Sequence, residues 1–181
     1  GQLVQARRAL RPDGLFLSAA FGGQTLQELR RVMAEVETRC RGGLSPRIAP
    51  MGEVRDMGAL LQRAGFALPV ADTRTIPVTY PSLRALVRDL RGMGETNALA
   101  NRDARPLTRD ELALAEELYA QHFPAPGGRI AVTFEFVFLT GWAPDDSQQK
   151  PLRPGSAQSR LADALGVPER PAGDPARGVQ D

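Results

Sequence analysis

A helix, a turn and an apolar strand make up the first 21 residues, and this unit constrains the fold more than any other segment. An amphipathic helical pattern ends near Leu10, the triplet at 12–14 (PDG) predicts a tight turn, and residues 15–21 (LFLSAAF) predict a short strand. A strand that is apolar on both sides belongs in a parallel sheet with helices on both faces. The opening of the chain therefore predicts an α/β fold.

The composition indicates a globular domain without a nucleic-acid surface. The chain has 181 residues, of which 42% are hydrophobic and 24% are charged, and its net charge is only +2. Acidic residues are interleaved with the arginines, which favours a solvated helix face over a phosphate-binding patch. We therefore expect no nucleic-acid partner, no transmembrane segment and a cytoplasmic location. The single cysteine, Cys40, falls in an apolar helical stripe, so we expect a small packed residue.

Periodicity and capping signals predict the remaining elements. Helices are expected over residues 25–41, 52–64, 82–93 and 108–122, and strands over 66–80 and 130–139. Thr25 is the expected cap of the first of these helices, and Thr108 and Glu111 form a capping box for the last. From Ala143 onward Pro, Gly, Ser and Arg dominate. We therefore divide the chain into a folded part at 1–142 and an extended or disordered tail at 143–181, with two helical turns expected at 159–165.

Several segments resemble one enzyme family. Residues 10–17 (LRPDGLFL) and 60–66 (LLQRAGF) are similar to motifs beside the fifth and sixth strands of class I S-adenosylmethionine-dependent methyltransferases. Residues 86–98 (LVRDLRGMGETNA) resemble a segment shared by the malonyl-carrier-protein methyltransferase of biotin synthesis and the complex I assembly factor 5 group. Residues 133–144 (TFEFVFLTGWAP) and 147–157 (SQQKPLRPGSA) resemble bacterial members of that assembly-factor group. The resemblance covers about residues 1–160.

The resemblance implies the C-terminal part of a Rossmann-like methyltransferase sheet. Its last three strands are then those at 14–21, 66–80 and 130–139, and the third of these lies between the other two and antiparallel to both. The insert at about 82–123 becomes a helical cap, and the strand at 14–21 is left with an exposed apolar edge. We expect a partner or a second copy of the chain, as a homo-oligomer, to cover that strand.

The resemblance also implies a function. It suggests a methyltransferase-like protein that acts on a protein substrate or complex I subunit, in respiratory complex I assembly. A malonyl-carrier-protein O-methyltransferase and a non-catalytic protein-interaction module are the alternatives. The full-length family uses S-adenosylmethionine, but its glycine-rich loop after the first strand and its acidic residue ending the second strand find no match in this chain. We expect this chain alone to bind no cofactor, which leaves open whether it is an enzyme.

The glycine-rich break at 92–97 is the best candidate for a ligand-binding segment. Two glycines, an acid and an amide at a helix end can approach a ligand closely and direct polar groups at it. Glu95 could pair with a guanidinium group, and Trp142 could line a pocket or seal the end of the sheet. His122, at a helix end, fits a surface or capping role. We name no catalytic residue and no metal ligand; the candidate substrate-binding residues are Arg91, Gly94, Glu95, Asn97 and Trp142.

Overall fold

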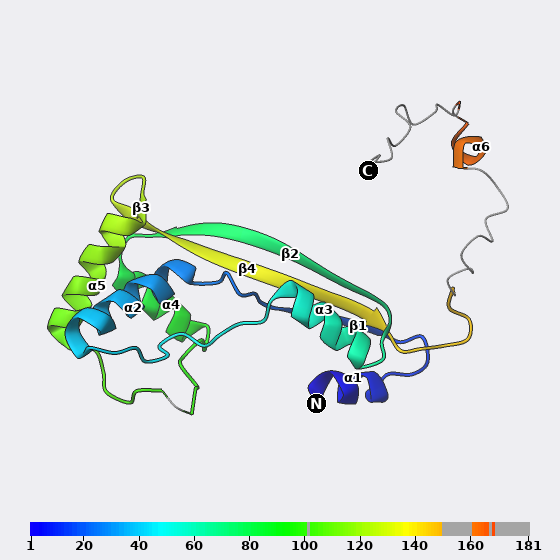
Figure 1. Cartoon of the computed structure of the whole chain (residues 1–181), viewed down its shortest axis with the longest axis horizontal. Helices are drawn as coiled ribbons and strands as arrows, with labels where there is room; N and C mark the ends of the chain where they lie inside the picture. The colour runs from blue at the N-terminus through cyan, green and yellow to red at the C-terminus, as the bar shows by residue number, and fades with distance from the viewer. Residues whose placement is uncertain (101, 150–160, 167, 169–181) are drawn as a thin grey trace, which may run out of the picture. The chain divides into compact units, whose positions relative to one another are not determined.

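One long strand, β4 (Arg129–Trp142), organises the sheet of this protein. The computed structural model describes residues 1–100, 102–149, 161–166 and 168, and it divides into units at 1–146 and 147–181. The first unit contains, in chain order, α1 (Gln2–Ala9), β1 (Leu15–Phe21), α2 (Gln27–Arg41), α3 (Val54–Arg63), β2 (Ala67–Tyr80), α4 (Leu83–Gly92), α5 (Arg109–His122), β3 (Pro124–Ala125) and β4 (Figure 1). The second unit contains α6 (Leu161–Leu165), where helical turns are predicted.

The strand order confirms the expectation for the sheet. The order is β1-β4-β2, and β4 runs antiparallel to both neighbours. Leu15 pairs with Trp142 and Phe21 with Phe136, so β1 lies beside the second half of β4. On its other side β4 pairs along nearly its whole length with β2, and the short β3 pairs with its beginning. The mixed α/β fold is thus as predicted, whereas within the described residues β1 has an antiparallel neighbour and no parallel one.

Burial along β4 changes phase near the middle of the strand. Even-numbered residues are buried from Ile130 to Phe134, whereas odd-numbered residues are buried from Glu135 to Gly141. The even-numbered side chains pack with α2, α4 and α5, and the odd-numbered ones pack near α1 and α3. Alternate side chains of a strand point to opposite faces of its sheet. The two groups of helices, which Figure 1 shows at opposite ends of the long β2–β4 ribbons, therefore cover opposite faces.

The face of the sheet opposite α1 and α3 exposes apolar side chains. Leu15 and Leu17 of β1 are 51% and 69% exposed, and Val70 of β2 and Phe138 of β4 also lie open. The pairing register places Leu17 and Val70 on either side of Thr140, so these side chains share one face. Within the described residues, β1 pairs only with β4 and its other edge is free. What covers this edge stays a prediction.

Two local expectations need correction. The helix predicted from Thr25 has Leu26 as its N-cap residue, at a left-handed φ of 58°, and begins at Gln27. Thr25 is unavailable as a cap because its hydroxyl donates to the Glu135 carbonyl at 2.9 Å and accepts from the Glu135 N–H at 3.0 Å. Cys40 is exposed rather than packed, because it lies near the end of α2, beyond the helix's last buried residue, Glu37.

Candidate functional site

The helical insert forms a cap at the end of the sheet where β1 finishes. We define the cap as residues 82–123, which comprise α4, α5 and the segment between them. Leu86 and Leu90 of α4 and Leu118 and Tyr119 of α5 are buried in one cluster with residues of α2 and the first half of β4. Phe21, the last residue of β1, packs against the same cluster. The cap is therefore held on the sheet by apolar packing.

A cavity of about 750 Å³ opens between the cap and α2, and we call it the cap pocket. Its volume lies within the range of small-molecule and side-chain binding sites. The apolar part of its lining comes from four separate segments: Leu29, Met33, Ile48, Val87, Leu107 and Leu112. A neighbouring hollow of about 440 Å³ shares Met33, Arg47 and Ile48 with it. The residues that the pocket requires are thus brought together only by folding.

Four arginines complete the lining of the cap pocket, and no described acidic residue lines it. Arg84, Arg88 and Arg91 come from α4, at positions that share one face of a helix. Arg84 forms an exposed ion pair with Glu116 at 3.3 Å. Arg88 and Arg91 are exposed and form no ion pair within the described part of the chain. Two cations at the pocket are therefore available to an anionic ligand.

Ion pairs fasten the segment between α4 and α5 to α2. Arg41 donates to Glu111 at 2.7 Å and to Asp103 at 2.8 Å, and its side chain is only 12% exposed. Arg47 donates to the buried Glu37 at 2.6 Å. These charge-assisted hydrogen bonds fix the position of one wall of the cap pocket.

The same contacts shift the pKa values of the two carboxyls. Hydrogen bonds from Arg41 and from the Thr108 N–H lower the pKa of Glu111 from 4.5 to about 2. Hydrogen bonds from Arg105, together with the charge of Arg41, hold the pKa of Asp103 well below its ordinary range. Both groups are therefore ionised at neutral pH, and they act as anchors rather than as proton donors.

The structure separates the five predicted substrate-binding residues. Arg91 lines the cap pocket, but Gly94, Glu95 and Asn97 are absent from its lining. Gly94 has a φ of +82° directly after α4, and the Glu95 N–H donates to the Leu90 carbonyl at 2.9 Å. This geometry ends a helix in the usual way, with glycine in the left-handed region. The exposed Glu95 side chain remains a candidate, and its role stays a prediction.

Asn97 has a structural task. Its Nδ2 donates to the Pro46 carbonyl at 2.7 Å, and its Oδ1 accepts from the Leu99 N–H at 3.1 Å. These bonds tie the segment after α4 to the segment after α2, beside the cap pocket. The amide is thus close to the pocket without lining it.

Trp142 lies at the other end of the sheet. It pairs with Leu15 at the start of β1 and with Ala67 at the start of β2, and its side chain is half-buried. The cap packs around the beginning of β4, about 40 Å away along a strand of this length. The structure therefore does not bring Trp142 together with Arg91.

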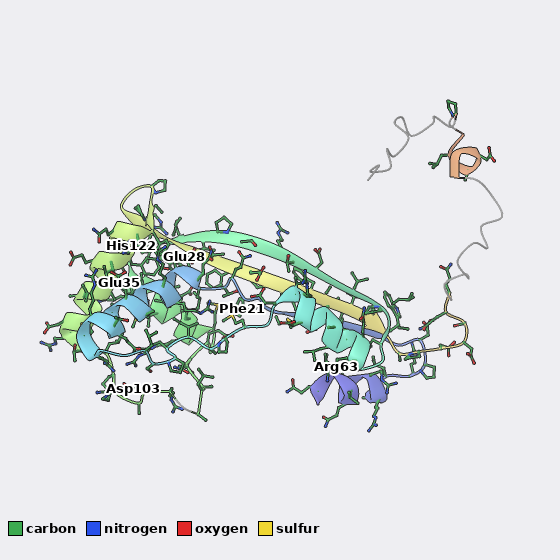
Figure 2. All side chains as sticks on the ribbon, viewed as in Figure 1. Phe21, Glu28, Glu35, Arg63, Asp103 and His122 are labelled. Carbon is green, nitrogen blue, oxygen red and sulfur yellow. The ribbon has the colours of Figure 1, made fainter. Side chains whose placement is uncertain are left out.

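His122 is engaged on the surface of the cap. Its Nε2 lies 3.2 Å from Glu35 Oε2, and Figure 2 shows the two side chains where α5 meets α2. This contact fits the surface role expected of a histidine at a helix end. Among the described residues, no three His, Cys, Asp or Glu side chains are grouped so that they could hold a metal ion. The described helices also include none with the length and apolarity needed to cross a membrane.

Sequence reasoning missed three of the pocket's four arginines. The spacing of Arg84, Arg88 and Arg91 could have indicated a basic helix face, because positions four and seven residues apart lie on the same side of a helix. Arg47 carried no such signal, since it comes from an irregular segment. Its place in the pocket depends on the hydrogen bond that it donates to Glu37 of α2.

The turn between β1 and α2 contains two glycines, Gly22 and Gly23. The resemblance places β1 at the fifth strand of the methyltransferase sheet, so this turn is not the glycine-rich loop that follows the family's first strand. A Cβ at Gly22 would collide with the Glu135 carboxylate, and one at Gly23 would collide with the Glu53 carboxylate. The two glycines therefore leave room for acidic side chains of the chain itself, and whether the chain binds S-adenosylmethionine stays a prediction.

Comparison with known proteins identifies clear relatives, although no protein-family model matches the chain. The chain is 40% identical over 163 residues to "Arginine-hydroxylase NDUFAF5, mitochondrial" of Danio rerio, covering 90% of this chain and 50% of that protein. Against the human protein of the same name it is 42% identical over 155 residues, with coverage of 86% and 45%. It is 33% identical over 153 residues to "Malonyl-[acyl-carrier protein] O-methyltransferase" of Laribacter hongkongensis, with coverage of 84% and 49%.

A solved structure of a proposed methyltransferase from Bacillus halodurans aligns with a TM-score of 0.44 and 13% identity, over 79% of this chain and 57% of that one. Similarity at this level is too weak to assign a family, so the assignment rests on the sequence relatives.

The length and the designated location of the relatives bear on two expectations. The chain spans about half the length of the curated relatives that it matches. The expected cytoplasmic location is wrong, because the names of the NDUFAF5 relatives point to mitochondria rather than to the cytoplasm in general. At 40–44% identity, the chain is a homologue of four vertebrate NDUFAF5 proteins over about half of their length and, at greater distance, of the malonyl-[acyl-carrier protein] O-methyltransferases.

Proposed function

We propose that this chain is the substrate-recognising portion of a methyltransferase-family protein that modifies a protein side chain during assembly of respiratory complex I. The relationship to NDUFAF5 supports the class of activity. The observation that carries the proposal is the cap pocket, which combines an apolar lining with two arginines that have no ion-pair partner among the described residues. A pocket of this kind can bind the apolar and charged side chains of another protein.

We propose use of S-adenosylmethionine only for a full-length protein of this kind. The resemblance implies that the full-length family uses S-adenosylmethionine, and the glycine-rich loop that would hold it finds no match in the sequence of this chain. We therefore assign to this chain the tasks of binding and orienting the protein substrate. That this chain alone binds no cofactor stays a prediction.

A chimaera tests the proposal. The half of human NDUFAF5 that aligns with this chain is replaced by the chain, and the chimaera is expressed in cells that lack NDUFAF5. We expect assembled complex I on native gels, and an added oxygen or methyl group on a complex I subunit by mass spectrometry. A chimaera that is stable and present in mitochondria, but restores neither, contradicts the proposal. Assembly without any added group would indicate a non-catalytic interaction module instead.

A malonyl-carrier-protein methyltransferase is the second candidate, favoured by the 32–34% identity to that group. The equivalent chimaera is built in the Laribacter hongkongensis enzyme and introduced into a bacterium that lacks its own copy. The preferred proposal predicts no growth without biotin. Growth without biotin would establish the second candidate and displace the first.

A further inference from the structure

The apolar part of the cap pocket is suited to large aliphatic or aromatic side chains. Its lining comes from α2, the segment at 47–48, α4 and the start of α5, so it is assembled from regions far apart in sequence. Met33 and Leu29 are nearly fully buried, whereas Val87, Leu107 and Leu112 are only partly buried. A ligand that covers the partly buried residues removes their apolar surface from water, which favours binding.

The basic part of the pocket points to an anionic ligand. No described acidic side chain lines the pocket. Nearby, Glu116 pairs with Arg84, and Asp89 accepts from the Tyr80 hydroxyl at 2.6 Å. Arg88 and Arg91 have no ion-pair partner within the described chain. An arginine can hold a carboxylate through two parallel hydrogen bonds.

The combination of charged and apolar lining favours a peptide over a compact anion. Arg88 and Arg91 are three residues apart on α4, which corresponds to about 4.5 Å along a helix. A single phosphate could bridge this pair, but it would leave the apolar lining of the pocket uncovered. Side chains on opposite sides of an extended peptide alternate, so a peptide can offer both acidic and apolar groups to the pocket.

We propose that the cap pocket binds an extended, acidic segment of a partner protein, in which acidic residues alternate with large apolar ones. The acidic side chains pair with Arg88 and Arg91, while the apolar side chains lie against Ile48, Leu107 and Leu112. This assignment gives the chemistry of the protein partner, and it rests on the proposed function for its biological meaning. Binding itself is a property of the chain and is measured without any activity.

The test uses the whole chain and a dye-labelled peptide with the core Glu-Leu-Glu-Leu-Glu between Gly-Ser ends. Fluorescence anisotropy should show saturable binding, and a probe with Gln in place of every Glu should bind at least tenfold more weakly. The double variant Arg88→Gln/Arg91→Gln should weaken binding of the acidic probe at least tenfold. The matched control Arg55→Gln/Arg74→Gln removes two exposed charges on α3 and β2, and should change binding less than twofold.

Three results would overturn the assignment. One is equal binding of the acidic and Gln probes. Another is unchanged binding by the Arg88→Gln/Arg91→Gln variant, provided that its thermal unfolding matches that of the control variant. The third is displacement of the probe by millimolar inorganic phosphate but not by chloride at the same ionic strength, which would identify a compact-anion site. If the chain binds the acidic peptide but the chimaera restores neither complex I assembly nor modification, the proposed function is refuted and the assignment of the pocket stands.

Discussion

Among single residues, Glu111 joins a helix cap to an ion pair. Its Oε2 accepts from the Thr108 N–H at 2.8 Å, which completes the capping box of α5, and from Arg41 at 2.7 Å. The capping box could be predicted because its two partners lie three residues apart. The ion pair could not, since Arg41 lies 70 residues away in the sequence and reaches Glu111 only in the folded chain.

Acid should therefore weaken the wild-type protein partly through Glu111. Its pKa falls from 4.5 to about 2 on folding, so the folded state binds fewer protons than the unfolded state between these values. The stabilisation is complete above pH 4.5 and is lost as the pH falls toward 2. Glu111→Gln should be less stable than wild type at pH 7, and the difference should shrink at pH 3, as measured by urea unfolding.

The control for this prediction is Glu117→Gln, an exposed position on the same helix. It should leave the pH dependence of unfolding parallel to that of the wild type. A Glu111→Gln variant that also runs parallel to wild type across this range would show that the Arg41 contact does not form in solution.

At the scale of elements, Gly92 and Gly94 look equivalent in the sequence, but they have different backbone conformations at the end of α4. Gly94 has a φ of +82°, whereas Gly92 lies within the helix and a Cβ there would meet nothing within 4 Å. Gly94→Ala should destabilise the chain by about 1 kcal/mol, because alanine is strained in the left-handed region. Gly92→Ala should stabilise it by about 0.5 kcal/mol through helix propensity.

Urea unfolding of the two variants measures both effects against wild type. Equal shifts of the same sign would contradict the helix end described here, and with it the position of the segment beyond α4. The pair of variants therefore also checks whether the glycine-rich break serves to end the helix.

Elements were more predictable than the contacts between them. Local periodicity located the helices and strands, and the capping box of Thr108 and Glu111 begins α5 as expected. The start of α2 was misplaced because Thr25 binds Glu135, which lies 110 residues away. The arginine row of α4 was readable from its spacing, but the pocket beside it depends on α2 and α5 packing together.

At the scale of the whole molecule, the family resemblance predicted the order of the strands in the sheet. It did not predict that the buried positions of β4 change from even-numbered to odd-numbered residues along the strand. Both the even and the odd positions of this strand carry apolar residues, so its alternation could not show which face is buried at which end. The structure resolves this by placing the cap on one face and α1 and α3 on the other. The site is thus a product of the fold, assembled at the end of the sheet that the cap covers.

Occupation of the cap pocket by a protein substrate is the central expectation for this molecule. A photo-crosslinking amino acid at Val87 of the NDUFAF5 chimaera, with the exposed Thr75 of β2 as control position, tests it in mitochondria. We expect position 87, and not position 75, to crosslink to a complex I subunit identified by mass spectrometry. The Arg88→Gln/Arg91→Gln change should abolish that product. Crosslinking to no complex I subunit, or equally from both positions, would contradict this role of the pocket.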